Sequence, residues 1–504
     1  MTPFGDRAVR FAVAEGAPRR RLVAELSALP GVRDVVLAEE IGCVVFDDDV
    51  GDRAAVTAGV TAALATGRGA ADDEPGAIHV VRVVYDGEDL DAVARAIGRS
   101  RQDVVALHAG AEYEVAMLGF MPGFAYLRGL PDVLRLPRRA PRTRVPAGSV
   151  AIAADYTGIY PFASPGGWHL LGRALGFQPF GAGSDARAAL AIGDVVRFAP
   201  AAEDDEPPRR DGPRAAAAPP ASRGEATPHL EITRASGFAI LVDAGRPGRM
   251  RDAVPPGGPL VCSRFARANA SAGNAPGACA IEVSGTLEVT AHGGRVTIAD
   301  DVAGARTLAE GERHVVATEG RTRVRYLALA GGIDAPVILG GRGALLVAGI
   351  GGLLRRGDRL APRAHDGASS VDAAGALGGG DAPDTDAPIA LMPGPDADAL
   401  PPDALTKTLF RVAAASDRTG TRLERLAAGA DHAAGGGVAA GAAHARRSTP
   451  MVSGAIELTP SGLIVLGPDH PTTGGYPVVA VVRSSSLDRL FAKPLRATVR
   501  LEFS

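Results

Sequence analysis

Residues 113–200 decide the fold of this chain, because they contain five short apolar stretches in close succession: YEVAMLGF (113–120), MPGFAYL (121–127), RVPAGSVAIA (144–153), TGIYPFASPGGWHLLGR (157–173) and GDVVRFAP (193–200). Each stretch has room for one or two strands, and Gly or Pro residues separate it from the next. Closely spaced strands with this turn chemistry predict an antiparallel barrel or sandwich.

The residues before this region predict a small α/β domain. Their apolar patterns follow the order strand, helix, strand, strand, helix. The expected strands lie at 7–13, 32–37 and 42–47, and the expected helices at 20–29 and 54–66. A strand at 77–85 and an amphipathic helix at 89–97 follow. Ser100 then caps a short helix through His108, with Asp103 in its first turn.

The second half contains two further β-rich runs, separated by segments without periodicity. Thr473–Pro477 (TGGYP) echoes Thr157–Pro161 (TGIYP), which indicates repeated barrel units. The sequence therefore predicts a mainly β chain with an α/β N-terminal domain. The predicted units are an α/β domain at 1–76, a barrel at 77–200, a flexible linker at 201–228, a barrel at 229–363, a flexible linker at 364–388, and a barrel at 389–504 that includes an Ala/Gly loop at 427–445.

Composition narrows the function classes. The 504 residues carry 54 basic and 57 acidic side chains, a formal charge of -3, without a basic stripe, so we expect no nucleic-acid partner. Cys43, Cys262 and Cys279 are far apart, which indicates buried thiols in a reducing compartment. The sequence contains no apolar run as long as the ~18 residues that a membrane span needs, so a cytoplasmic protein is expected.

Motifs of a self-sufficient enzyme are missing as well. The sequence contains no GxxxxGK[ST], GxSxG or HExxH and no metal-ligand spacing, so a metal site is not predicted. The GxGxxA string at 181–186 lacks the strand-turn-helix setting of a dinucleotide site. The chain therefore offers no independent ATPase.

Three Gly/Pro-rich segments, at 119–126, 141–149 and 160–168, are the best candidates for a binding site. Their backbone N–H groups can face a small anion, and Arg142 and Arg144 supply donor forks for a carboxylate or phosphate. The alternative is that the segments are tight turns whose aromatic residues are core and whose arginines are solvated. Residue types alone favour this structural interpretation.

Six side chains are considered for proton transfer. His108, Tyr126 and Ser164 qualify by chemistry, although a His at a helix end is more often a capping residue. His432 and His444 lie in the Ala/Gly loop and are expected to be solvated. His470 is the better candidate, because Pro and Gly constrain its surroundings in PDHPTTGGYP.

The order of these motifs resembles a known family. HxGxxYxVxMLGFxPGFxYLxGLP, PRxxVPAGSVAIA and TGIYPxxSPGGWxLxGR resemble allophanate hydrolase subunit 1, also called the B subunit of bacterial 5-oxoprolinase. The second half is similar to the companion subunit 2, or the C subunit. The matching residues there are Asp243–Gly248, Pro255, Pro256, Asn269, Gly273–Pro276, Glu282, Gly331–Asp334, Pro393–Pro395, Ser416–Arg418 and Thr472–Pro477.

The resemblance implies a fold and an activity. Such proteins have cyclophilin-like barrels, one in the first subunit and two in the second, similar to the carboxyltransferase domain of urea carboxylase. With a separate LamB/YcsF-type A subunit they open 5-oxoproline to glutamate at the expense of ATP, expected here as its Mg complex. The resemblance implies a fused B/C component without attached biotin. The missing apolar run adds the expectation of no membrane partner, and formation of a homo-oligomer is left open.

The resemblance also implies site residues in both halves. The implied catalytic residues are Arg142, Arg144, Tyr160, Asp243, Arg246 and His470. Those implied to bind substrate or nucleotide are Phe124, Tyr126, Gly148, Ser149, Ser164, Gly166, Gly167, Trp168, Asp417, Arg418, Thr473, Gly474, Gly475 and Tyr476.

The chain departs from the family pattern at five positions. Val242 replaces a usual Gln, Val261 replaces a usual acidic residue, and Tyr156, Glu457 and Pro471 stand where Gln is usual. Two rival functions therefore stay open. One is a carboxyltransferase acting on urea or a similar amide, although the chain lacks a biotin carboxylase module and a Met-Lys biotinylation motif. The other is a non-enzymatic inhibitor of a sensor kinase.

Overall fold

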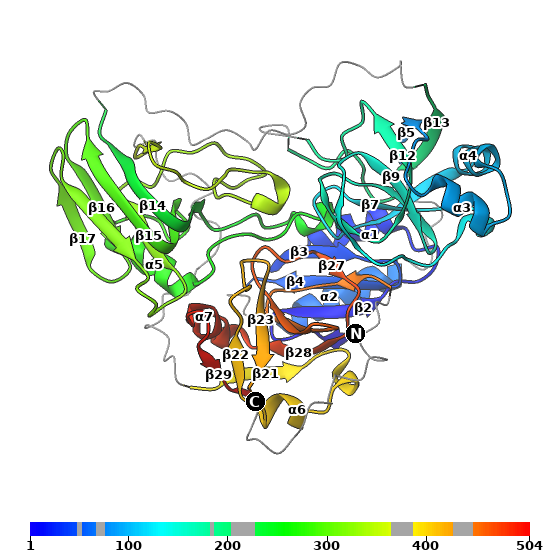
Figure 1. The fold of residues 1–504 in the computed structure, drawn as a ribbon. Helices are drawn as coiled ribbons and strands as arrows, with labels where there is room; N and C mark the ends of the chain where they lie inside the picture. The colour runs from blue at the N-terminus through cyan, green and yellow to red at the C-terminus, as the bar shows by residue number, and fades with distance from the viewer. Residues whose placement is uncertain (48–52, 67–75, 182–185, 203–226, 364–386, 427–446) are drawn as a thin grey trace.

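The computed structural model describes the chain except for residues 48–52, 67–75, 182–185, 203–226, 364–386 and 427–446. Figure 1 shows residues 229–363 as a lobe on the left and residues 77–200 as a lobe on the right. Below them, the N-terminal domain packs beside the last part of the chain. The predicted linkers and the Ala/Gly loop with His432 and His444 fall almost wholly outside the described residues, so the domain limits stay predictions.

The N-terminal sheet is buried on both faces. Successive side chains of a strand point to opposite faces, and here Val44 and Phe46 pack with the helices whereas Cys43 and Val45 pack against the last module. This double burial explains the continuous apolar run GCVVF. The sheet order is β1 (Thr2–Pro3), β2 (Ala8–Ala12), β4 (Ile41–Phe46), β3 (Val32–Leu37), and the helices are α1 (Arg19–Ser27) and α2 (Arg53–Thr66).

The region 77–200 folds into a closed barrel. Its first and last strands pair in parallel, which requires a crossover, and two helices supply part of it. Ser100 caps the second helix as predicted, and Asp103 completes a capping box with it. Around the barrel the strands are β10 (Tyr156–Ile159), β7 (Ala125–Arg128), β6 (Glu112–Leu118), β13 (Val195–Pro200), β5 (Ile78–Val84), β12 (His169–Leu175) and β9 (Ser149–Ala153). Helices α3 (Leu90–Ala96) and α4 (Arg101–Ala109), and a ribbon of β8 (Arg142–Val145) with β11 (Ser164–Gly166), complete it.

Two long antiparallel strands organise the second sheet. At their midpoint Gly237 faces Gly285, each with a positive φ. A Cβ on either glycine would stand within 2.3 Å of a carbonyl oxygen of the opposite strand, so only glycine fits there. The strands run in the order β17 (Gly304–Leu308), β16 (Val296–Asp300), β19 (Arg325–Leu329), β15 (Ala280–His292), β14 (His229–Val242), β20 (Arg359–Leu360), and β18 (Arg313–Ala317) pairs with β15. The segments between strands contain the helical elements η4 (Met250–Asp252), α5 (Cys262–Ser271) and η5 (Leu346–Ala348).

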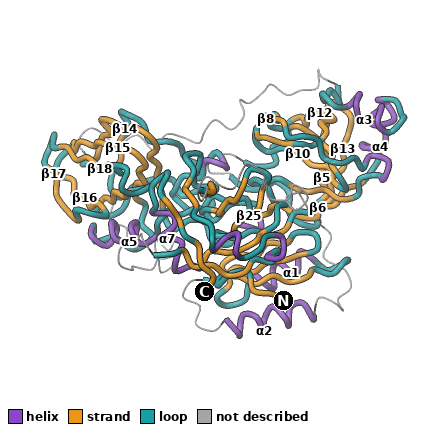
Figure 2. Tube along the Cα trace, turned by 60° about the horizontal axis from the view of Figure 1, so that its bottom comes forward, coloured by secondary structure: helices purple, strands orange, loops and turns teal. Residues whose placement is uncertain are grey.

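The third sheet joins both neighbours. The strands run in the order β29 (Thr498–Val499), β22 (Phe410–Val412), β23 (Gly420–Arg425), β26 (Gly462–Leu466), β25 (Ala455–Thr459), β28 (Val478–Val482), β21 (Ile389–Pro393), β30 (Leu501–Phe503). A separate short pair joins β24 (Thr449–Pro450) to β27 (Thr473–Gly474). The helical elements of this region are η6 (Ala397–Ala399), α6 (Asp403–Thr406) and α7 (Ser484–Ala492). Helices α5 and α7 lie side by side in Figure 2. The Asp488 carboxylate of α7 accepts hydrogen bonds from the N–H groups of Cys262 and Ser263, which caps α5.

The predicted fold class is confirmed. The chain is mainly β with a small α/β sheet at its N-terminus, the first barrel is closed, and β-sheets organise both later units. The described cysteines are free thiols; Cys43 and Cys279 are buried as expected, and Cys262 is half-buried. None of the helices in the described ranges is long and apolar enough to cross a membrane.

Candidate active site at the junction of the two halves

An aromatic cluster lies on the outer face of the barrel strands: Tyr126 and Leu170 belong to it, whereas their neighbours Leu127 and Leu171 face the barrel core. Phe124 packs edge-on against Tyr126, Tyr160 and Trp168, with ring centroids 5.0–5.4 Å apart. All four are buried, and burial raises the pKa of Tyr160 to about 12. The cluster therefore has the character of a wall, as the structural interpretation of this block predicted.

The second half touches this wall through residues 467–477, which we call the junction loop. The backbone N–H of Phe120 donates to Thr473 Oγ1 at 3.2 Å. Burial raises the pKa of Tyr126, and hydrogen bonds to Ser448 and Thr473 oppose the rise. Segments more than 300 residues apart thus meet at two residues that the resemblance had implied for binding.

Gly119 makes this close approach possible. A Cβ at this position would stand 1.9 Å from Thr473 Oγ1 and 2.9 Å from Thr473 Cβ. We predict that Gly119→Ala lowers the free energy of unfolding by about 1–3 kcal/mol, the usual cost of overpacking. Urea unfolding will measure it, with Gly352→Ala as the control, because Gly352 has open space around it and no positive φ.

A double-mutant cycle separates this clash from other effects of the alanine. Thr473→Ser removes the methyl group, so it should recover part of the loss in the Gly119→Ala background, with a coupling energy above about 0.5 kcal/mol. Additive effects would contradict the contact.

The two implied catalytic arginines of the first half have different surroundings. Arg142 Nη2 donates to both carboxylate oxygens of the buried Asp89, at 2.6 and 2.5 Å, and Nη1 donates to the Trp168 carbonyl. Asp89 also accepts from the backbone of Leu170 and pairs with Arg139. Arg142 is therefore engaged in fixing the loop before β12. Arg144 is exposed and forms no hydrogen bond or ion pair with another described residue, so its guanidinium is available to a ligand.

Most backbone groups named in the implied binding loops around Arg144 form hydrogen bonds with neighbouring loops of the same barrel. Gly148 N–H donates to the Tyr160 carbonyl at 2.7 Å, and Tyr160 N–H donates to the Ser149 carbonyl at 3.0 Å. Gly167 accepts from Arg139 N–H, and a Cβ on Gly166 would stand 2.4 Å from the Tyr160 hydroxyl. The Ser164 hydroxyl is the exception, because it is buried without a partner in the described part of the chain.

His108 belongs to the core of the barrel and caps nothing. Its Nε2 lies 2.9 Å from Thr157 Oγ1 and its Nδ1 lies 2.8 Å from the Tyr85 hydroxyl. Because Thr157 Oγ1 donates to the Ala151 carbonyl, it accepts from Nε2–H, and Nδ1 accepts from Tyr85. Burial lowers the pKa of His108 to about 3, so it is a neutral structural residue.

A buried charged cluster lies at the other end of the junction loop. Arg418 Nε and Nη2 form a fork on the carboxylate of Asp469, at 2.8 and 2.9 Å. Arg418 Nη1 donates to Glu282 Oε1 at 2.7 Å, and Nη2 also reaches the Gly258 carbonyl. Although burial acts to lower it, the pKa of Arg418 is raised by Asp469 and Glu282. Glu282 accepts further hydrogen bonds from Tyr326 Oη and Leu260 N–H, so the cluster ties all these segments together.

Arg246 lies beside this cluster. Its fully buried side chain donates to the carbonyls of Ile338 and Gly343, and burial lowers its pKa while Asp243 and Asp469 oppose the change. Asp243 accepts from the N–H groups of Gly245 and Arg342. Both residues therefore hold loops. Asp417 behaves likewise, because its carboxylate accepts from Thr419 and Gly420 N–H in a tight turn.

Unpartnered polar atoms gather on the junction loop. His470 Nδ1 donates to the Pro471 carbonyl at 2.7 Å, which leaves Nε2 as an acceptor, and burial lowers the pKa of the ring to about 4. His470 Nε2 and Thr472 Oγ1 are buried and find no partner in the described ranges. Buried polar atoms of this kind call for a ligand, a water or a proton-transfer role. Gly474, Gly475 and Tyr476 continue the loop half-exposed.

Glu457 lies beneath the loop and was missed as a site residue. A Cβ on Gly474 would stand 2.6 Å from its carboxylate. Burial raises the pKa of Glu457 from 4.5 to about 7. The folded chain therefore holds this proton more tightly than the unfolded chain, and the free energy of unfolding falls as the pH rises from about 4.5 to about 7.

Glu457→Gln should abolish that slope. We expect the variant to be more stable than the wild type at pH 8, by about 1–3 kcal/mol from a shift of this size at 1.4 kcal/mol per pH unit, and nearly equal to it at pH 4.5. Urea unfolding at both pH values measures the difference, and Glu424→Gln, exposed on β23, is the control. Equal stabilities at pH 8 would show that the carboxyl ionises freely.

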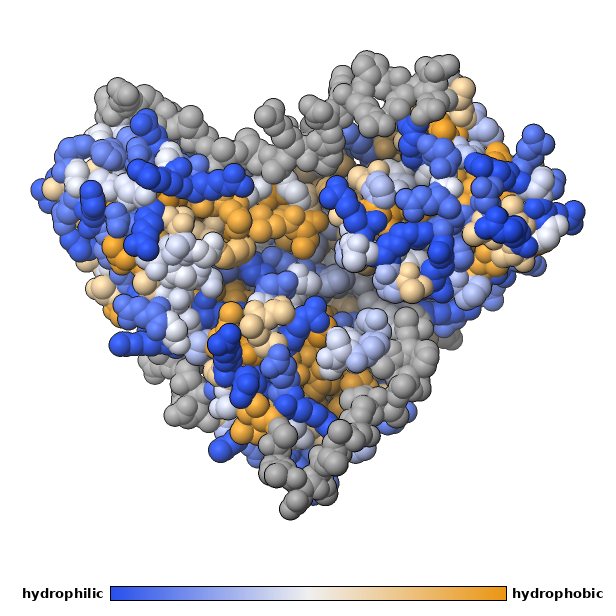
Figure 3. Space-filling model, in the orientation of Figure 1, coloured by the Kyte–Doolittle hydropathy of each residue, from blue (hydrophilic) through white to orange (hydrophobic). Residues whose placement is uncertain are grey.

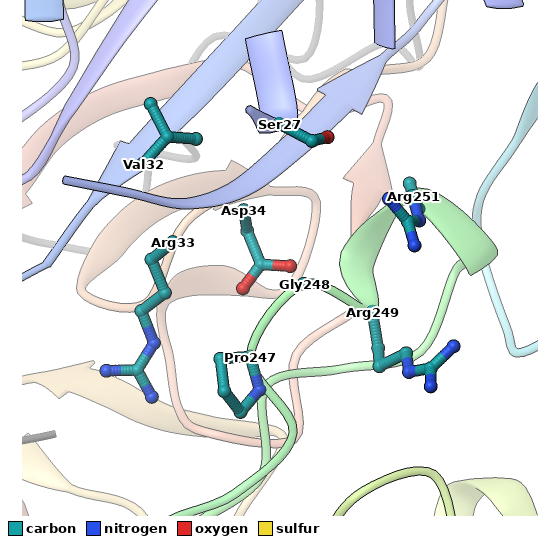
Figure 4. Close-up of a pocket in the computed structure, with 8 residues that line it drawn as sticks. All are labelled: Ser27, Val32, Arg33, Asp34, Pro247, Gly248, Arg249 and Arg251. Atoms are coloured by element: carbon teal, nitrogen blue, oxygen red, sulfur yellow. The ribbon is translucent and has the colours of Figure 1, made fainter. Parts of the chain in front are cut away.

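A cavity of about 230 Å³ lies farther along the same interface, between β3 and residues 247–251. Figure 4 shows the Asp34 carboxylate at its centre and the side chains of Arg33, Arg249 and Arg251 spread apart around it. Asp34 Oδ1 accepts from Met250 N–H at 3.0 Å, and burial raises the pKa of Asp34 to about 6. Because the arginines do not converge, we interpret the cavity as part of the packing between the halves.

The junction loop therefore unites two groups of implied residues. At one end Thr473 meets the aromatic wall of the first half; at the other, Asp469 and His470 adjoin Arg418, Arg246 and Glu282. Glu282 matched the family pattern without being assigned to the site. Glu457 had a signal in sequence, as a departure from the usual Gln, which was not read as a site residue.

Two family descriptions match this architecture. "Carboxyltransferase domain, subdomain C and D" matches residues 1–185, and "Carboxyltransferase domain, subdomain A and B" matches residues 252–503, half of the chain. The chain therefore belongs to the carboxyltransferase-domain family, with both parts fused in one polypeptide.

The two halves of the chain are similar to different individual proteins. The first half is similar to the 5-oxoprolinase B subunit of Escherichia coli O157:H7, with 49% identity over 127 residues, 24% of this chain and 58% of that protein. The match thus spans little more than half of that relative. The 5-oxoprolinase C subunit of Escherichia coli K12 is 28% identical over 291 residues, 53% of this chain and 88% of that protein. The solved structure of TTHA0988 is similar over 99% of this chain and 100% of its own, with a TM-score of 0.81 and 29% identity.

Proposed function

We propose that this chain is the fused B/C component of an ATP-dependent 5-oxoprolinase, which opens 5-oxo-L-proline to L-glutamate together with a LamB/YcsF-type A subunit. One observation carries the proposal. The half similar to the B subunit and the half similar to the C subunit meet through the junction loop, where Phe120 N–H donates to Thr473 Oγ1. A shared contact of this kind fits a reaction that needs both subunits.

The chemistry follows from the substrate. The ring amide is a poor electrophile, so its carbonyl oxygen first attacks the γ-phosphorus of ATP, supplied as the Mg complex, and ADP leaves. Water then adds to the activated carbon, the C–N bond breaks as the nitrogen takes a proton, and a second water releases phosphate from the acyl phosphate. Positioned cations and N–H donors stabilise the charge that develops.

Residues of this chain suit parts of that sequence. Arg144 carries a guanidinium available to the substrate carboxylate or the transferred phosphoryl group. His470 Nε2, held unprotonated, is an acceptor for a proton, and Glu457, with a pKa of about 7, suits a proton donor or acceptor near neutral pH. The A subunit would supply the remaining acid and base groups.

The departures at Val242 and Val261 lie in the core and leave the charged cluster intact. Val242 and Val261 are buried in one apolar cluster, and Val261 N–H donates to the Tyr326 hydroxyl that also holds Glu282. Valine at these positions is thus accommodated by packing beneath the charged cluster, without opening it to water.

A substrate panel tests the proposed reaction. The chain mixed with the A subunit should release ADP with 5-oxo-L-proline and form glutamate in equal amount, and urea should not replace the substrate. ADP release without glutamate, or turnover with urea and a biotin carboxylase, would favour a rival function.

A further inference from the structure

The segment 337–353 of the second lobe exposes an unusual amount of apolar surface. Of the twelve large hydrophobic side chains that are exposed in the described part of the chain, four belong to these seventeen residues. They are Val337, Leu346, Val347 and Leu353, each about two-fifths exposed. Figure 3 shows hydrophobic surface gathered between the two upper lobes, where Figure 1 places this segment.

The opposite side of the segment is firmly packed. Leu345, Ala348 and Ile350 form an apolar cluster with Phe180 of the barrel, and Phe162 packs against it. Leu345 and Ile350 exchange backbone hydrogen bonds, which fixes the turn that carries Leu346 and Val347. The exposed side chains are thus presented by an ordered turn, and they extend an apolar contact that already exists between the two halves.

The base of the segment reaches the candidate active site. Arg246 donates to the carbonyls of Ile338 and Gly343, and Asp243 accepts from Arg342 N–H. Arg246 in turn lies near Asp469 of the junction loop. The segment that carries the exposed side chains is therefore anchored at its base beside the charged cluster.

We propose that Val337, Leu346, Val347 and Leu353 form the docking surface for the A subunit. Apolar surface gathered on one side of a fold marks an interaction site, and residues near the centre of an interface carry most of the affinity. Arg355 and Arg356 are exposed at the end of the segment, so the partner face has an apolar centre and an acidic rim. This assignment rests on the proposed function, because it commits to the A subunit as the occupant.

The test measures the affinity of the full chain for the A subunit by calorimetry. The double variant Leu346→Asp/Val347→Asp should bind roughly 30-fold more weakly or worse, as expected for residues at the centre of an interface. Val302→Asp, between β16 and β17 on the outer edge of the same lobe, is the control and should bind like the wild type. Affinity that the double variant retains in full would overturn the assignment.

Hydrogen exchange of the wild-type chain keeps the test decisive if the double variant fails to fold. The A subunit should slow exchange within 337–353, and protection confined to other segments would overturn the docking surface while leaving the proposed function intact. Failure of the A subunit to bind the wild-type chain at all would refute both.

Discussion

Arg144→Ala is expected to lower the rate of 5-oxoproline-dependent ADP release by the chain with its A subunit by about 10²–10³-fold, the usual effect of removing one donor that stabilises developing charge. The side chain is exposed, and its guanidinium makes no polar contact with the rest of the described chain. Its removal should therefore leave the thermal unfolding temperature unchanged. Loss of activity without loss of stability is the combined result that we predict.

The control for this variant is Arg197→Ala on the same barrel. Arg197 pairs with Glu112 at the surface, with both side chains more than half exposed, and such pairs contribute little. The control should keep full activity. Unchanged kinetics of Arg144→Ala in a complex that binds the A subunit normally would remove Arg144 from the site.

Arg418→Ala is expected to have the largest effect on stability, a fall of about 3–5 kcal/mol in the free energy of unfolding, because it leaves Glu282 and Asp469 buried without their common cation. Urea unfolding of the full chain measures it. Arg411→Ala, an exposed position on β22, should change stability by less than about 0.5 kcal/mol.

Removing a carboxylate with the cation tests whether the charges are the cause. Arg418→Met/Glu282→Gln should be more stable than Arg418→Ala, because one buried charge is no longer left unpaired. A double variant that is less stable than Arg418→Ala would attribute the loss to packing instead of charge.

The fold was accessible from sequence wherever local chemistry determined it. Closely spaced apolar runs and Gly/Pro turns predicted the strands of the barrel, and the Ser100 cap with Asp103 in the first turn of its helix was predicted as well. The burial of the N-terminal sheet on both faces could not be predicted, because the partner of Cys43 and Val45 lies some 400 residues later in the chain.

The site was accessible in part. The motif order identified Thr473, Arg418 and His470 as candidate site residues, and the structure connects them through the junction loop. The same motifs could not separate Arg142, which is engaged by Asp89, from Arg144, because Asp89 reaches the site from a different segment. Glu457 was noted as a departure from the family pattern and was not assigned to the site, because its raised pKa comes from burial, a property of packing.

The central claim is that the two fused halves form one site that works only with the A subunit, and the rate of 5-oxoproline-dependent ADP release tests it most directly. It should be measured with this chain alone, with the A subunit alone and with both. We expect turnover in the mixture only. Robust turnover by this chain alone, or none in a mixture whose complex is demonstrably formed, would contradict it.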